Sequence, residues 1–95
     1  MSLWRFDQVP NAATLTTRQV LEEKKPILVA VHYASDHSWA FLCGTTDDEK
    51  DARVIRLGEA HLLDPTIAGI STLPPGHRAY RSLVGGPWTK EKIED

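Results

Sequence analysis

Apolar positions along the chain form two runs that are too dense to belong to loops. In residues 27–33 apolar side chains occupy both alternating sets of positions, and β-branched valines are frequent. This pattern is typical of a central strand covered on both faces. Residues 39–43 continue in the same way, with Trp39, Phe41 and Cys43 on one side. Because only a short polar SDHS segment separates the runs, they predict an antiparallel hairpin.

A helical pattern precedes this hairpin, in the stretch LTTRQVLEEKKP. Thr16 and Gln19 have the spacing of a capping box, and Leu15 and Val20 have that of a hydrophobic staple. Pro26 prevents continuation of a helix. The stretch therefore predicts a helix of about two and a half turns with Thr16 as its N-cap.

Three shorter elements are expected after the hairpin. Residues 53–57 alternate as a third strand, and in DPTIAGI Asp64 can cap a short helix that has Pro65 in its first turn. The LPPG turn leads into a last strand, HRAYRSLV, and the polar tail KEKIED is expected to fray. The order of elements predicts an α+β fold: a small, mostly antiparallel sheet with one N-terminal helix and a second short helix.

Size and composition indicate one ordinary globular unit. Ninety-five residues suffice for one hydrophobic core, so residues 1–95 are predicted to form a single domain. Hydrophobic residues make up 41% and charged residues 25%, which argues against disorder. No apolar run is long enough to cross a bilayer, and the N-terminus lacks a basic stretch followed by an apolar block.

Charge and cysteine content narrow the expected partners and compartment. The net charge of −2 and the scattered cations give no basic stripe for nucleic acid. A single cysteine, Cys43, cannot form an intramolecular disulfide, in agreement with a reducing compartment. We therefore expect a cytoplasmic protein that binds neither nucleic acid nor membrane, and the oligomeric state stays open.

The segment HYASDHSWAFLCG concentrates candidate chemistry within about a dozen residues. Ser35, Asp36 and His37 are consecutive, whereas nucleophile, base and orienting acid normally converge from separate elements. Side chains of these types commonly bond to their own backbone in turns. A turn is therefore favoured over a catalytic triad.

A metal site built from His32, His37 and Cys43 remains an alternative, because residues flanking one hairpin can lie close together. Structural zinc usually needs four ligands with paired short spacings, which are absent here. The favoured interpretation is a partly buried His32 bonded to a backbone carbonyl, an exposed His37 and a buried, unreactive Cys43. No cofactor is predicted.

Three other polar groups have ordinary explanations that we prefer. DDEKD at 47–51 lacks the ligand spacing of a calcium loop and is expected to be solvated. Glu59 and His61 are two positions apart and would diverge on a helix. Arg78 and Tyr80 share one strand face that could bind an anion, although a mixed polar sheet edge is the simpler interpretation.

Several segments together resemble a small bacterial family, formerly a domain of unknown function and later grouped with putative immunity proteins of polymorphic toxin systems. The corresponding segments are a tryptophan strand ending in glycine, an acidic stretch, V-x-L-G, Asp-Pro, and a Pro-x-Gly turn followed by arginine, found here at Trp39 to Gly44, Asp47 to Asp51, Val54 to Gly58, Asp64-Pro65 and Pro74 to Arg81. The resemblance spans roughly residues 20–88. It implies a toxin-like protein partner and no catalytic residue.

The functional expectation is a non-enzymatic, cytoplasmic protein-binding domain, of the immunity type if the resemblance holds. The stretch expected to face a basic partner is the acidic loop, because its crowded carboxylates repel one another and add little to folding. Its members are Asp47, Asp48, Glu49 and Asp51. The alternative function is a small-ligand or metal-binding module that uses His32, His37 and Cys43.

Overall fold

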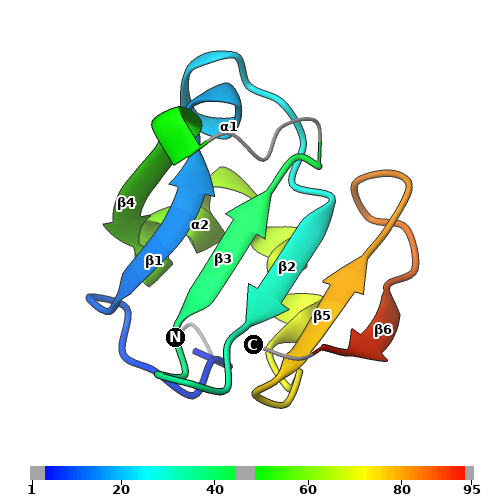
Figure 1. The fold of residues 1–95 in the computed structure, drawn as a ribbon. Coiled ribbons are helices and arrows are strands. Elements are labelled where there is room, and N and C mark those ends of the chain that lie inside the picture. The colour runs from blue at the N-terminus through cyan, green and yellow to red at the C-terminus, as the bar shows by residue number, and fades with distance from the viewer. Residues whose placement is uncertain (1–3, 45–48, 94–95) are drawn as a thin grey trace.

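The computed structural model describes residues 4–44 and 49–93. Six strands, two short α-helices and two 3₁₀ turns follow one another along the chain (Figure 1). In order they are β1 (Ala13–Thr17), α1 (Arg18–Glu22), β2 (Val29–His32), β3 (Trp39–Leu42), η1 (Glu49–Asp51), β4 (Ala52–Arg56), α2 (Leu57–Leu63), η2 (Pro65–Ile70), β5 (His77–Tyr80) and β6 (Thr89–Lys92). The α+β class is as expected.

The six strands form one mixed sheet in the order β4-β1-β3-β2-β5-β6. Four neighbouring pairs are antiparallel, and β1 runs parallel to β3. The expectation of a small, mostly antiparallel sheet is therefore corrected in part: the sheet is wider than predicted and contains a parallel pair. Sequence pattern alone does not show which strands become neighbours.

The central hairpin is confirmed. β2 and β3 pair antiparallel from Val29 opposite Leu42 to His32 opposite Trp39. The third predicted strand is also present, as β4. Leu57, expected to end this strand, instead begins α2 and is fully buried.

The predicted N-terminal helix is present as α1 (Arg18–Glu22), but it is shorter than expected and its predicted N-cap is wrong. Residues 13–17 form β1, and α1 has only five residues. Thr16 is not an N-cap: its hydroxyl is buried and donates to the carbonyl oxygen of Phe41, 2.7 Å away, across the β1–β3 pair. Thr17 is at the N-cap position, but its side chain makes no capping bond. Pairing with two neighbouring strands therefore overrides the local capping pattern.

The second short helix is confirmed at η2. The Asp64 carboxylate accepts the backbone N–H of Thr66 at 3.0 Å, and Pro65 lies in the first turn. The preceding helix, α2, was not predicted, because no Ser, Thr, Asp or Asn directly precedes LGEAHLL; in the structure the Glu59 carboxylate accepts the backbone N–H of Arg56 at 3.2 Å and so closes the first turn. After η2, Gly76 has a φ of +78°, in agreement with the predicted turn.

The expectation of a fraying tail is wrong for residues 90–92, and residues 94–95 of that tail lie outside the described part of the structure. Residues 89–92 form the edge strand β6, which pairs antiparallel with β5 from Tyr80 opposite Thr89 to His77 opposite Lys92. The sequence TKEK has no apolar alternation, so its strand conformation depends on β5 and not on burial.

The two faces of the sheet have different neighbours. α2 and η2 lie behind the sheet in Figure 1, whereas no helix covers the face turned toward the viewer. We call these the inner face and the outer face. The hydrophobic core is on the inner face, where Trp39, Phe41, Ala30 and Ala79 are at most 1% exposed. The expectation that residues 27–33 are covered on both faces holds only in part: among the outer-face residues, Val31 is buried at 8% exposed, whereas Val29 and Tyr33 are half-buried.

Candidate functional site

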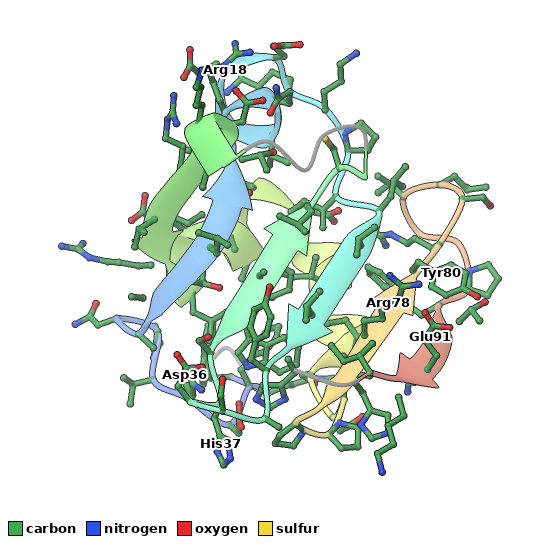
Figure 2. The ribbon with its side chains drawn as sticks, in the orientation of Figure 1. Arg18, Asp36, His37, Arg78, Tyr80 and Glu91 are labelled. Carbon is green, nitrogen blue, oxygen red and sulfur yellow. The ribbon has the colours of Figure 1, made fainter. Side chains whose placement is uncertain are left out.

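The β2–β3 loop is a turn held by its own side chains. The Asp36 carboxylate accepts both the hydroxyl and the backbone N–H of Ser38, at 2.7 and 3.0 Å. These bonds, the hydroxyl bond above all, lower the pKa of Asp36 below its ordinary value. His37 has a φ of 61° and is exposed at the tip, where Figure 2 shows its side chain directed away from the sheet. Asp36 bonds to Ser38 and not to His37, so the preference for a turn over a triad is supported.

His32 contacts a backbone carbonyl, as the favoured interpretation predicted, but it is fully and not partly buried. It is 1% exposed, its Nδ1 lies 2.7 Å from the carbonyl oxygen of Leu73, and its ring stacks on Trp39 with a centroid distance of 4.0 Å. Its Nε2 lies 3.4 Å from a carboxylate oxygen of Asp7, a distance of ion-pair type that falls short of hydrogen-bond geometry. The other oxygen of Asp7 accepts the Trp39 indole N–H. The Asp7 carboxylate therefore contacts both the His32 ring and the Trp39 ring at this end of the core.

The alternative metal set is not brought together. The ring centroids of His32 and His37 are 6.1 Å apart. Cys43 comes directly after Leu42, at the end of β3 that is farther from His37. Cys43 is 3% exposed among core residues, as expected for a small buried side chain. Within residues 4–44 and 49–93, no group of three or more His, Cys, Asp or Glu side chains could hold a metal ion.

The candidate anion site is already neutralised by a neighbour. Arg78 and Tyr80 share the outer face, with the guanidinium carbon 5.9 Å from the ring centroid. The Arg78 guanidinium also pairs with Glu91 of β6, and Figure 2 shows these three side chains close together at that edge. The mixed polar edge expected from the sequence is the arrangement observed.

Part of the acidic loop serves the fold. The Asp51 carboxylate accepts the Gln19 side-chain amide at 2.9 Å and pairs with Arg18 at 3.4 Å, so it joins η1 to α1. The bond to Asp51 raises the pKa of Arg18 above its ordinary value. For Asp51 the expectation of little contribution to folding is thus wrong. Asp47, Asp48 and the Glu49 side chain lie outside the described part of the structure.

Arg81 forms a buried polar network that sequence analysis missed. Its guanidinium donates to the carbonyl oxygen of Ile27, to the Thr66 hydroxyl and to the Asp64 carboxylate, the last at 2.7 Å. It also lies 4.2 Å from the Trp88 ring centroid. Arg81 is 6% exposed. Because the Arg81 donors and the Asp64 acceptor are bonded to each other and to neighbouring groups of the protein, the Arg81–Asp64 pair holds segments of the fold together and offers no reactive group.

The outer face provides a broad, partly apolar surface. One row of residues crosses all six strands, from β4 to β6: Val54, Leu15, Ala40, Val31, Arg78 and Glu91. The row changes from apolar on four strands to charged on the last two. Val54 at the β4 end is 70% exposed and Tyr80, four strands away on β5, is 41% exposed, whereas Ala40 and Val31 between them are buried at 0% and 8%. We call the apolar part on β4, β1, β3 and β2 the apolar half of the outer face.

A shallow hollow lies in this apolar half. It has a volume of about 270 Å³ and is lined chiefly by Leu15, Tyr33 and Val54. Among its lining residues only Tyr33 carries a titratable group. The hollow therefore offers contact area and no acid–base pair.

Comparison with known proteins gives no relative: no family model, no curated protein and no solved structure matches the chain. Among the described residues, no helix combines the length and apolarity that crossing a membrane requires.

Proposed function

We propose that the chain is a non-enzymatic, cytoplasmic protein-binding domain that contacts its partner through the apolar half of the outer face. The observation that carries this proposal is the exposure of Val54 in a sheet face that no helix covers. Exposed apolar surface of this kind marks interaction sites when it is bounded by polar groups. Here the boundary is the Arg78–Glu91 pair.

The form of the surface favours a folded protein as occupant. Five spacings of about 4.8 Å make the sheet about 24 Å wide, a breadth that suits a protein surface better than a small ligand. The resemblance to putative immunity proteins supplies the kind of partner: a toxin-like protein, for which an adjacent gene is the natural source. Such a partner would present an apolar patch to Val54 and Leu15.

The acidic loop keeps a narrower role in this proposal. Asp47, Asp48 and Glu49 stay the candidates for contact with a basic partner surface, whereas Asp51 is bonded to Arg18 and Gln19. Charges at the edge of an interface act mainly on the association rate. Replacing Asp47 and Asp48 with Asn should slow association at low salt and have less effect as salt rises.

The test is association with the product of the adjacent gene, measured by biolayer interferometry. Val54→Glu places a charge in the apolar half and should weaken binding at least about tenfold, a loss of about 1.4 kcal/mol. The matched control is Leu62→Glu, because Leu62 is 82% exposed on α2, away from the outer face. If both variants lose the same affinity, or if Val54→Glu loses none, the outer face is not part of the interface. If the unaltered protein does not associate with this product, the proposal of an immunity-type partner is wrong.

A further inference from the structure

A second and larger hollow lies away from the outer face, where three connections of the chain meet. Its volume is about 470 Å³, within the range of small-molecule sites. The α1–β2 connection, the junction of α2 with η2 and the β5–β6 connection each contribute to its lining. The residues that matter for its chemistry are Val20, Ile27, Leu63, Val84, Lys24 and Lys25.

The walls of this hollow are apolar. Val20 and Ile27 belong to the buried core and are 4% and 2% exposed. Leu63 and Val84, from the opposite connections, are 44% and 46% exposed. Two large side chains thus remain in contact with water at the hollow, and a ligand with an apolar body would cover them.

The charge around the hollow is positive. Among the described residues, the carboxylates near the hollow have arginine partners: Glu23 with Arg18 at 3.1 Å, Glu22 with Arg53 at 4.0 Å, and Asp64, which lines the hollow, with Arg81 at 2.7 Å. Lys24 and Lys25 are exposed, and neither forms an ion pair within the part of the chain that the structure describes. The two ammonium groups therefore leave an excess of positive charge at an apolar site.

We propose that this hollow binds a small apolar carboxylate, with its hydrocarbon body against Val20, Ile27, Leu63 and Val84 and its carboxylate beside Lys24 and Lys25. A neutral molecule of the same size would gain only the apolar contacts. An apolar cation would be repelled by both lysines. The ligand class follows from this combination of a mostly apolar lining and two lysines that form no ion pair with the described residues, and the site is independent of the protein-binding face.

Octanoate is a suitable probe, with 1-octanol and octylammonium as molecules of matched chain length. Each is titrated into ¹⁵N-labelled protein, and amide shifts are followed by two-dimensional NMR. Octanoate should shift the amides of Val20, Ile27 and Val84, with about fivefold to tenfold higher affinity than 1-octanol, because two partly exposed ion pairs contribute about 1 kcal/mol or slightly more. Octylammonium should bind more weakly than either.

Charge variants test the lysines directly. Lys24→Gln with Lys25→Gln should lower octanoate affinity about fivefold to tenfold and leave 1-octanol affinity unchanged. Glutamine has the same unbranched Cβ as lysine, so the substitution adds no strain at position 24, where the backbone is left-handed with a φ of 57°. The matched control is Lys90→Gln with Lys92→Gln on β6, which changes net charge equally and should leave octanoate affinity as it was.

Three outcomes would overturn the proposal. The first is the absence of shifts in these amides at about 10 mM octanoate, a concentration that detects even millimolar binding. The second is octylammonium binding as well as octanoate does. The third is a loss of octanoate affinity in the β6 control equal to that in the variant of Lys24 and Lys25.

Discussion

Two rows of side chains cross the same six strands on opposite faces of the sheet; both are buried at their centre, and they differ most at Val54, which is 70% exposed at the β4 end of the outer row. The inner row is Ile55, Thr14, Trp39, His32, His77 and Lys92, and the outer row is Val54, Leu15, Ala40, Val31, Arg78 and Glu91. On the inner face, α2 and η2 cover the centre of the row (Figure 1). A polar side chain there bonds to the neighbouring strand: the Thr14 hydroxyl donates to the carbonyl oxygen of Trp39 at 2.7 Å. On the outer face of the same sheet, the Val54 side chain is exposed to water. The comparison separates residues that hold the fold from residues available for contact.

The largest expected difference between the faces concerns Trp39. It is 1% exposed and packs on both His32 and Phe41, so Trp39→Ala removes a large buried ring and should cost about 3 to 5 kcal/mol of unfolding free energy. Val54→Ala on the outer face should change stability by no more than about 0.5 kcal/mol. Urea unfolding measures both. An unmoved midpoint in Trp39→Ala would contradict the assignment of the inner face as the core.

Two arginines provide the next comparison. Arg81→Met leaves the Asp64 carboxylate without its buried partner and should cost about 3 kcal/mol. Arg78→Met breaks a solvent-exposed pair with Glu91 and should cost less than about 1 kcal/mol. Thermal and urea unfolding of the two variants should therefore differ widely. Similar losses would mean that the Arg81 network is weaker than its geometry indicates.

Two adjacent threonines test the corrected position of β1 on a smaller scale. Thr16→Val removes the hydroxyl that donates to the Phe41 carbonyl and should cost about 1 kcal/mol. The Thr17 hydroxyl is buried with no hydrogen-bond partner among the described residues, so Thr17→Val should be neutral or stabilising. Urea midpoints distinguish the two. The reverse order would favour an N-capping role for Thr17 over the sheet bond of Thr16.

The smallest expected effect is at the exposed end of the hairpin. Ser38→Ala removes the hydroxyl bond to Asp36, so the pKa of Asp36 should rise toward its ordinary value of 3.8. A carboxyl with a lowered folded-state pKa adds stability above its unfolded-state pKa and loses it as the pH falls through the folded-state value. The variant should therefore show less acid-dependent destabilisation. NMR titration of the Asp36 carboxyl carbon measures the shift, and an unchanged value would exclude the Ser38 hydroxyl as its main cause.

Local signals in the sequence predicted those elements that depend on local interactions. The β2–β3 hairpin has a dense apolar pattern on both sides of a short polar loop, and Asp64 with Pro65 is a helix start that needs no distant partner. Both were found where expected. The burial of His32 and Cys43 also followed from their places in apolar strands.

Elements that depend on distant partners were missed, because a local pattern carries no information about residues far away along the chain. β1 contains Thr16 and Thr17, whose spacing to Gln19 suits a helix start, yet pairing with β3 and β4 uses those backbone groups in a sheet. β6 has no apolar pattern and forms only beside β5. Arg81 gives no sequence signal for its partners, because they come from two distant segments: Ile27 from the α1–β2 connection, and Asp64 and Thr66 from the start of η2.

The place of β1 between β3 and β4 bears on how the chain acquires its structure. β2 and β3 are joined by a short loop and can pair as soon as both exist, whereas β1 must close loops to residues 39–40 and 52–56. Loop closure of this length precedes any gain from pairing, so non-local strands form slowly. During synthesis from the N-terminus, β1 emerges well before either neighbour. A ribosome-bound chain that stops before residue 39 would therefore carry an unpaired, threonine-rich strand, and the late insertion of β1 would complete the sheet.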